Sequence, residues 1–311
     1  MHRRQFLRCL GLAAALPGMG RATLAAAEST PAAESAPAPA AAAPGGTHKI
    51  LSCNVRGDLA GDARTGDSWA ERREFCADVI RAQRPDLICL QECQQNNWKY
   101  LKLRLPEFDS FGLFDPGPVP HPMNTLFFTR ARYELLSAGG FWLSEQPHVA
   151  GSKSWDTAYS RLVNWVHLRE RATDRELRVW NTHLDHLGAV AREKQAELIV
   201  QAAAVFPATL PQLLTGDFNC PAGSPPAERI RAAGWTDTYA AVHGPKDPGF
   251  TFHGFQGPGF ATHKLARKLS GKIDFIWCRG PVKTLAAEII RDGRNGHYPS
   301  DHYFISAVVA M

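Results

Sequence analysis

Six short polar segments, each at or just past a predicted strand, hold most of the side chains that could do chemistry. They are residues 52–56, 90–92, 181–186, 216–219, 272–276 and 300–302. Carboxylates of this kind can hold a hard divalent cation or activate a water molecule. Amide and imidazole N–H groups can meet the non-bridging oxygens of a phosphate. The segments therefore supply each type of group that metal-assisted phosphoester hydrolysis requires.

Two of these segments place acidic side chains at strand ends. Glu92 follows the apolar run 86–90, where a carboxylate is costly unless a metal ion or a salt bridge neutralises it. Asp217 and Asn219 are two residues apart, so in an extended segment both face the same way and can address one phosphate. A tight turn is the alternative for the same residues.

Histidines occupy two further segments. Asn181, His183 and Asp185 share a face by period two, and His183 could donate to a phosphoryl oxygen. A zinc site at His183 and His186 is the rival interpretation, and it is disfavoured because no cysteine or histidine partner has a fitting spacing.

Asp274 lies in an apolar strand, whereas Asp301 and His302 follow a Pro-Ser turn. Adjacent side chains diverge on a strand, so a loop is predicted at Asp301 and His302. A histidine paired with a carboxylate keeps one tautomer and a raised pKa, and it can then contact phosphate as a cation.

Taken in order, these residues resemble the endonuclease/exonuclease/phosphatase superfamily, which includes apurinic-site endonucleases, neutral sphingomyelinases and inositol-phosphate 5-phosphatases. The resemblance spans residues 47–311. It implies that Mg²⁺ or Mn²⁺ is held by Glu92, Asn54 and Asp301. The catalytic residues it implies are His183, Asp217, Asn219, Asp274 and His302. In that pattern Asp217 activates the water, Asp274 orients His302, and water attacks in line without a covalent enzyme intermediate.

A closer similarity, to a bacterial branch of the superfamily, rests on residues 140–147, 151–156 and 292–301 together with Arg161. Arg161 and Asn181 are expected to bind substrate, although a structural ion pair is an equal alternative for Arg161. That branch often has Gly-Arg and Glu before the strand at 124–129, whereas this chain has Val-Pro-His-Pro-Met-Asn at 119–124. The difference affects an edge that could contact substrate.

The elements that must position these residues alternate between strands and helices. A strand at 48–55, a helix that begins with the Ser68–Glu71 capping box, and a buried strand at 86–91 form an early β-α-β unit. Further strands are predicted at 124–129, 133–141, 162–168, 176–181, 212–215, 272–278, 282–290 and 303–309, with a helix at 190–206. The prediction is an α/β fold: a four-layer, deoxyribonuclease-like sandwich of two mostly antiparallel, mixed sheets with helices outside.

The first residues predict an export signal and a linker. Residues 1–27 resemble a twin-arginine signal peptide, and the Ala/Pro-rich residues 28–46 are expected to be a disordered linker before a catalytic domain at 47–311. Four arginines and no acids lie in residues 1–27, so the net charge of +5 falls to +1 without them. A periplasmic or secreted protein that uses the twin-arginine translocase is therefore expected, and net charge gives no support for a dedicated nucleic-acid binder.

The substrate is left open at this stage. Phosphorylated small molecules, lipids and nucleic acids all remain candidates, a secreted nuclease is the alternative enzyme, and a non-catalytic binding protein is the non-enzyme alternative. A basic stretch between residues 263 and 272 could grip an anion or could be a solvated loop. Six cysteines follow the signal, and their apolar surroundings favour free thiols over disulfides. No stable protein partner is implied.

Overall fold

The computed structural model describes residues 46–114, 116, 123–264 and 271–311. The predicted signal peptide, almost all of the predicted linker, most of the stretch at 119–124 and the centre of the basic stretch (265–270) lie outside the described residues. No helix among the described residues is long and apolar enough to cross a membrane.

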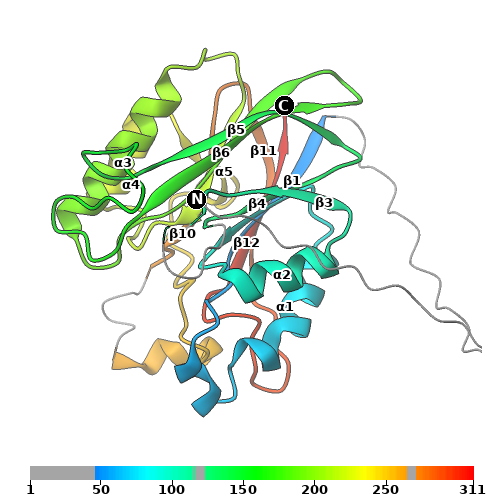
Figure 1. The fold of residues 1–311 in the computed structure, drawn as a ribbon, viewed down its shortest axis with the longest axis vertical. Helices are drawn as coiled ribbons and strands as arrows, with labels where there is room; N and C mark the ends of the chain where they lie inside the picture. The colour runs from blue at the N-terminus through cyan, green and yellow to red at the C-terminus, as the bar shows by residue number, and fades with distance from the viewer. Residues whose placement is uncertain (1–45, 115, 117–122, 265–270) are drawn as a thin grey trace, which may run out of the picture. The chain divides into compact units, whose positions relative to one another are not determined.

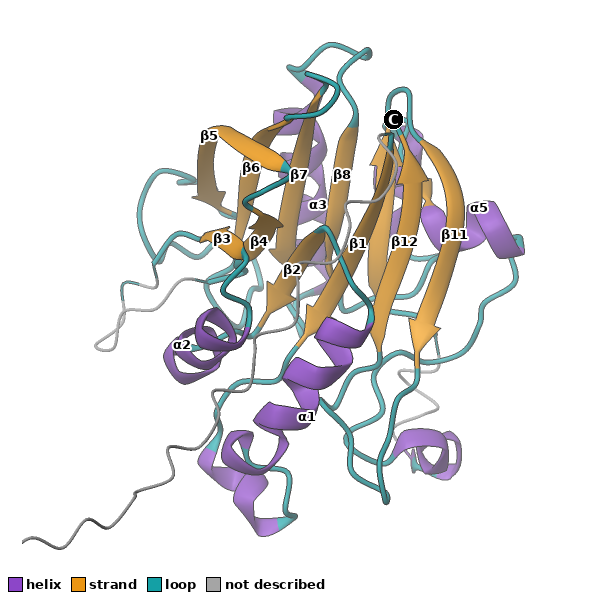
Figure 2. Ribbon diagram, turned by 90° about the vertical axis from the view of Figure 1, so that its right-hand side faces the viewer, coloured by secondary structure: helices purple, strands orange, loops and turns teal. Residues whose placement is uncertain are grey.

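The strands form two six-stranded sheets (Figures 1 and 2). Sheet 1 has the order β11-β12-β1-β2-β4-β3, with β1 Thr47–Asn54, β2 Leu87–Gln91, β3 Phe108–Phe111, β4 Leu126–Thr129, β11 Lys283–Ile290 and β12 Phe304–Ala310. Sheet 2 has the order β5-β6-β7-β8-β10-β9, with β5 Tyr133–Trp142, β6 Leu162–Glu170, β7 Glu176–His183, β8 Gln212–Asp217, β9 Thr236–Asp237 and β10 Asp274–Arg279.

Five α-helices and two short 3-10 helices connect these strands within the described residues. The α-helices are α1 Trp69–Ala82, α2 Gln95–Arg104, α3 Ala189–Ala204, α4 Pro225–Ala232 and α5 Thr238–His243. The 3-10 helices are η1 Ala60–Arg64 and η2 Gly257–Thr262. Helix α1 starts where the sequence predicts, because the Ser68 and Glu71 side chains form the expected capping box.

Three apolar clusters separate four layers. The central cluster lies between the two sheets and includes Ile50 of β1 and Val179 of β7. A second cluster joins sheet 1 to α1 and α2, and a third joins sheet 2 to α3 and α4. Figure 1 shows these two helix pairs on opposite sides of the strands. The predicted four-layer sandwich is confirmed.

Each sheet contains one parallel strand pair, β1 with β2 and β7 with β8, and its other pairs are antiparallel. The arrowheads of β1 and β2 point to the same end of sheet 1 in Figure 2. Because parallel strands finish at one edge, each pair brings the residues at its carboxyl end together. Strand β10 runs antiparallel to β8, so its first residue, Asp274, is the register partner of Asp217.

All six cysteines among the described residues are buried and unpaired. Burial raises the pKa of each of these thiols, and Cys76 and Cys89 each reach about 12. They therefore behave as small apolar side chains of the core rather than as reactive thiols.

Candidate active site

The ends of both sheets converge on one cluster of polar side chains. Sheet 1 contributes side chains at the end of β1, just after β2 and just before β12: Asn54, Glu92, Asp301 and His302. Sheet 2 contributes side chains at or just past the ends of β7, β8 and β10: His183, Asp217, Asn219 and Asp274. These are the eight positions that the resemblance implies as catalytic or metal-binding.

Asn54 connects the two sheets at the centre of this cluster. Its amide nitrogen donates to Glu92 Oε1 at 3.1 Å and to Asp217 Oδ2 at 3.0 Å. Its oxygen accepts the main-chain N–H of Arg56 at 3.0 Å. The structure thus places the nitrogen of this side chain, and not its oxygen, toward the carboxylates.

His302 pairs with two aspartates. Its Nδ1 lies 2.9 Å from Asp274 Oδ2, and its Nε2 lies 3.7 Å from Asp217 Oδ2. Burial opposes protonation of His302, but the charges of Asp274 and then Asp217 outweigh it and raise the pKa of His302 to about 10. His302 is therefore an imidazolium at neutral pH. As predicted, Asp301 and His302 lie in a loop, which holds a single bridge between Phe252 and His302.

Asp217 and Asn219 meet through a turn and not along an extended segment. Strand β8 ends at Asp217, Asn219 has a φ of 51°, and its N–H donates to Asp217 Oδ1 at 2.9 Å. The expectation of an extended segment was wrong, because this local hydrogen bond favours the turn. Both side chains still reach the site, since Asn219 Nδ2 lies 2.9 Å from His183 Nε2. Burial and then the charge of Arg161 lower the pKa of His183, so this ring is neutral.

The cluster has the character of a cation site. Asp217, Asp274 and His302 each offer an atom within 4.8 Å of the others, but a protonated His302 has no lone pair for a metal ion, so only the carboxylates could be ligands. Burial, followed by the charge of Asp274, raises the pKa of Asp217 to about 7, and burial also raises the pKa of Asp301. The charge of Glu92 helps to raise the pKa of Asp301, although the charges of His302 and of Arg56, 3.3 Å from Asp301, oppose this. A hard divalent ion bound by oxygens of Glu92 and Asp301 would offset the repulsion between them, so these residues fit the expected metal.

Arg161 lies beside this cluster with 13% of its side chain exposed. Its Nε is 3.8 Å from Asp185 Oδ2, and its guanidinium is in electrostatic range of Asp217 and Glu92. The structure therefore shows the ion pair that was the alternative for Arg161, and it also places the arginine within electrostatic range of two carboxylates of the cluster.

Asn181 is in a different place from the one expected of a substrate-binding residue. Its side chain is fully buried between the sheets, where it donates to Leu90 O at 2.9 Å and accepts from Gln91 Nε2 at 2.6 Å. Thr215 Oγ1 donates to the same oxygen at 3.1 Å. The period-two pattern identified the face of β7 correctly, but that face meets sheet 1 at Asn181 and opens to the site only at His183.

Two residues that position the site were not assigned that role from the sequence. Arg72 of α1 is 4% exposed and donates to five main-chain carbonyls around the site loops. Asp185 is fully buried and accepts five hydrogen bonds from residues 157–159 and 187–188. Arg72 did carry a signal, because a charged residue stood on the apolar face of the predicted helix.

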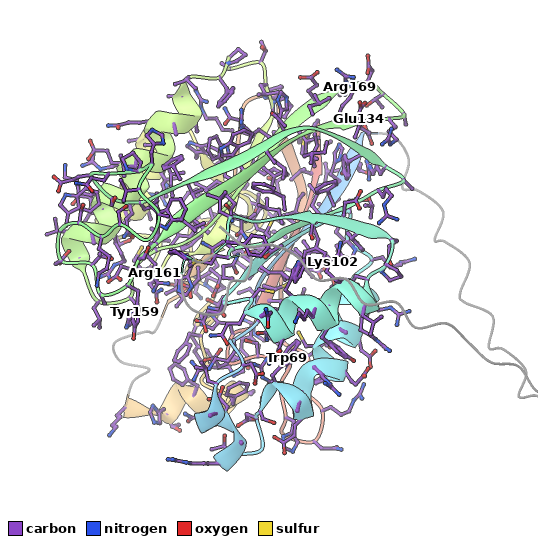
Figure 3. All side chains as sticks on the ribbon, in the orientation of Figure 1. Trp69, Lys102, Glu134, Tyr159, Arg161 and Arg169 are labelled. Carbon is purple, nitrogen blue, oxygen red and sulfur yellow. The ribbon has the colours of Figure 1, made fainter. Side chains whose placement is uncertain are left out.

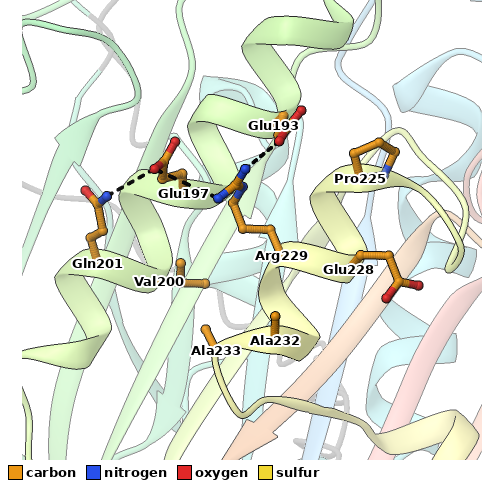
Figure 4. A pocket seen from close by; sticks show the side chains of 9 residues that line it. All are labelled: Glu193, Glu197, Val200, Gln201, Pro225, Glu228, Arg229, Ala232 and Ala233. Atoms are coloured by element: carbon orange, nitrogen blue, oxygen red, sulfur yellow. Dashed lines mark hydrogen bonds and ion pairs between the residues drawn. The ribbon is translucent and has the colours of Figure 1, made fainter.

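A groove between α3 and α4 lies apart from these residues (Figure 4). Arg229 pairs there with Glu193 at 2.5 Å and with Glu197 at 3.9 Å. The lining is acidic, with three glutamates and one arginine, and none of the eight clustered side chains lines the groove.

Several solved structures are similar to this chain over most of its length. A mannosyl-6-phosphatase from Bacteroides thetaiotaomicron is 26% identical, with a TM-score of 0.75 over 85% of this chain and 100% of that chain. An endonuclease/exonuclease/phosphatase from Bacteroides vulgatus is 27% identical, with the same TM-score over 85% of this chain and 99% of that chain. The human Nocturnin catalytic domain, at 19% identity, a TM-score of 0.66 and coverage of 85% of this chain and 93% of that chain, shares the fold.

Matches to curated sequences are shorter. Nocturnin from Drosophila melanogaster is 26% identical over 161 residues, which span 49% of this chain and 24% of that protein. An uncharacterized mimivirus protein is 26% identical over 145 residues, which span 44% of this chain and 54% of that protein. The matched segments thus cover only about a quarter and about half of these relatives. The model of one protein family, however, matches residues 51–302, which include every residue of the cluster. The chain therefore belongs to the Endonuclease/Exonuclease/phosphatase family.

Proposed function

We propose that this protein is a divalent-metal-dependent phosphoesterase that hydrolyses small phosphate esters, with sugar phosphates as the leading substrate class. The observation that carries the proposal is the position of Asp217, whose Oδ2 lies 3.0 Å from Asn54, 3.4 Å from His183 and 3.7 Å from His302. A carboxylate in contact with donors from both sheets is suited to hold an attacking water. The similarity to a mannosyl-6-phosphatase supports the substrate class.

Glu92 and Asp301 would hold Mg²⁺ or Mn²⁺, with Asn54 between Glu92 and Asp217. When bound, the ion would neutralise phosphate charge and polarise the phosphorus–oxygen bonds. Arg56 stays within 3.3 Å of Asp301 and so keeps that carboxylate oriented.

Hydrolysis would use Asp217 as the base. Water attacks phosphorus in line with the leaving oxygen, and one water proton moves to Asp217 Oδ2 as the new phosphorus–oxygen bond forms. The bond to the alcohol oxygen breaks with its electron pair, and that oxygen takes a proton from solvent. Asp274 keeps His302 protonated throughout, so the imidazolium stabilises charge on the non-bridging oxygens.

Neutral donors complete the phosphate site. Asn219 Nδ2 lies 2.9 Å from His183 Nε2, and a phosphate oxygen would take the place of this contact by accepting an N–H from each of the two groups. Arg161 approaches from the opposite flank, beside Asp185. Arg161 is proposed to bind a second oxygen, because a guanidinium can donate two parallel hydrogen bonds to phosphate.

The test is turnover by the purified protein with Mg²⁺ or Mn²⁺ against hexose 6-phosphates, p-nitrophenyl phosphate, bis-p-nitrophenyl phosphate, and single-stranded and duplex DNA or RNA. Asp217→Ala should lower kcat by at least about 1,000-fold, and EDTA should abolish turnover reversibly. Glu228→Gln is the matched control, because this carboxylate on α4 pairs with Arg231 at the surface and is not one of the eight clustered side chains.

Preference for nucleic acid would select the nuclease alternative. Turnover that survives both EDTA and Asp217→Ala would refute the mechanism. Metal binding without turnover of any substrate would favour the non-catalytic alternative.

We also propose that residues 1–27 direct export through the twin-arginine translocase, on the basis of the paired Arg3 and Arg4 before an apolar stretch. Replacement of both arginines by lysine should retain the protein in the cytoplasm of a producing bacterium. Unchanged export of this double variant would contradict the proposal.

A further inference from the structure

Two stacked rings lie next to the phosphate site. The rings of Tyr159 and His186 have centroids 5.4 Å apart and an interplanar angle of 28°. Both residues are exposed, and Tyr159 has 62% of its surface accessible. A tyrosine ring that stacks against an imidazole and remains 62% exposed leaves aromatic surface open to a ligand.

Asp185 fixes the two segments that carry these rings. Its Oδ2 accepts the main-chain N–H of Ala158 at 3.0 Å and that of Tyr159 at 3.1 Å. Its Oδ1 accepts the N–H groups of Leu187 at 3.0 Å and Gly188 at 2.7 Å. One buried carboxylate thus holds the main chain on either side of the stack, so the backbone that carries the rings is fixed before any ligand arrives.

Asp156 adds a second connection between the same segments. Its Oδ1 accepts the N–H of Ala191 at 2.7 Å near the start of α3. The packing is tight, because a Cβ added at Gly188 would lie 2.6 Å from Asp156 O. The exposed pair therefore stands on a rigid support, which lowers the entropy cost of binding there.

Arg161 links the stack to the reacting centre. Its Nη2 lies 3.4 Å from His186 Nδ1, and its guanidinium carbon lies 5.9 Å from the centre of the Tyr159 ring. Figure 3 labels Arg161 and Tyr159 next to each other. The same guanidinium is in electrostatic range of Asp217 and Glu92. The ring pair therefore lies directly beside Arg161, one of the groups proposed to bind the phosphate.

We propose that Tyr159 and His186 form a stacking platform for the ring of the alcohol esterified to the phosphate. The inference rests on the proposed function and narrows it to phosphate esters whose alcohol carries a ring close to the ester oxygen. A sugar and a nucleoside share this chemistry, since each offers a ring face to an aromatic side chain. A ringless alcohol, such as glycerol, has no face to offer the platform.

The test compares kcat/KM for hexose 6-phosphate and nucleoside 5′-monophosphate, which carry rings, with that for the ringless glycerol 3-phosphate. Tyr159→Ala should lower kcat/KM about tenfold or more for at least one ring-bearing ester and change it less than about twofold for glycerol 3-phosphate. Tyr159→Phe keeps the aromatic face and should keep most of the preference. The ester whose kcat/KM falls more in Tyr159→Ala shows whether the platform binds a sugar ring or a nucleoside.

An equal loss on all esters, or no loss on either ring-bearing ester, would overturn the platform. Calorimetric binding of the same esters to Asp217→Asn, with and without Tyr159→Ala, separates this inference from the proposed function. A Tyr159-dependent preference for rings in binding, without turnover by the wild type, would leave the platform standing and refute the phosphoesterase. Turnover that does not depend on Tyr159 would support the phosphoesterase and refute the platform.

Discussion

Replacement of Arg72 by methionine should loosen the site without touching any group that contacts phosphate. The five N–H groups of Arg72 all donate to main-chain carbonyls, at 2.6–3.1 Å. The acceptors are Val55, Arg56, Gly57, Asp67 and Pro299. Three of them follow Asn54 directly, and Pro299 precedes Asp301 by two residues. The arginine therefore fixes the separation between the loops that carry these two site residues.

The magnitude follows from the carbonyls left behind. Methionine keeps most of the apolar volume of the side chain but offers no donor. Water can reach some of the five oxygens after the change. If two stay buried and unpaired at about 1–3 kcal/mol each, the free energy of unfolding falls by about 4 kcal/mol. In a domain of this size, such a loss lowers Tm by about 8–16 °C. Displacement of the loops by about 1 Å would cost about 100-fold in kcat/KM.

Thermal unfolding followed by circular dichroism, and kcat/KM at a temperature where both proteins are folded, would measure these effects. Arg73→Met is the matched control, because Arg73 is the exposed neighbour on the same helix and packs over Tyr100. Arg72→Lys keeps the charge, reaches fewer carbonyls and should be intermediate. A Tm and a kcat/KM for Arg72→Met that match those of Arg73→Met would refute the reasoning.

Three further changes test separate parts of the molecule. Burial and then the charge of Arg132 lower the pKa of His48 to about 4, so its contribution to stability is complete above its ordinary pKa of 6.5 and is lost as the pH falls toward 4. Between about pH 7 and about pH 4.5, the free energy of unfolding measured in urea should therefore fall by about 2–3 kcal/mol more for the wild type than for His48→Gln. Equal decreases in the two proteins would contradict this. Burial opposes the charge of Asp185, but the hydrogen bonds from Gly188, Tyr159 and Leu187 lower its pKa to about 2. Asp185→Asn should lower the free energy of unfolding by about 2 kcal/mol, whereas the exposed control Asp174→Asn should leave it unchanged, and equal midpoints in urea would count against the role of Asp185. Asp301→Asn should raise the Mg²⁺ concentration that gives half-maximal turnover at least about tenfold, and an unaltered metal dependence would remove Asp301 from the ligand set.

The layered fold could be predicted because periodicity and strand-end chemistry agree in this chain. The capping box at Ser68 and the apolar runs of β2 and β8 are local features, so they appear in the sequence directly. Helix α2 was not predicted, because Gln95–Arg104 has only two buried residues and a weak apolar stripe. The partner of each strand is a non-local property, so the strand orders β2-β4-β3 and β8-β10-β9 could be known only from the structure.

The site was predictable residue by residue but not in its geometry. Asn181 is a polar residue on the same face of β7 as His183, so the sequence alone cannot distinguish it from a site residue. Its hydrogen bonds to sheet 1 show that it is buried between the sheets. The turn at Asn219 depends on one hydrogen bond from its own N–H to Asp217. The acceptors of Arg72 lie up to 227 residues away along the chain. Contacts of that kind leave no pattern in a single sequence beyond a charge at an apolar position.

The seam between the two sheets crosses the reacting centre, because Asn54 binds Glu92 of sheet 1 and Asp217 of sheet 2 through one amide group. A small slide of one sheet over the other would pull these carboxylates apart while every helix and strand stayed intact. The turnover rate should therefore fall when one sheet slides over the other, whereas the far-ultraviolet circular dichroism spectrum should not change. Hydrostatic pressure acts on the void volume of such interfaces, so it should inactivate the protein reversibly at pressures below those that unfold it.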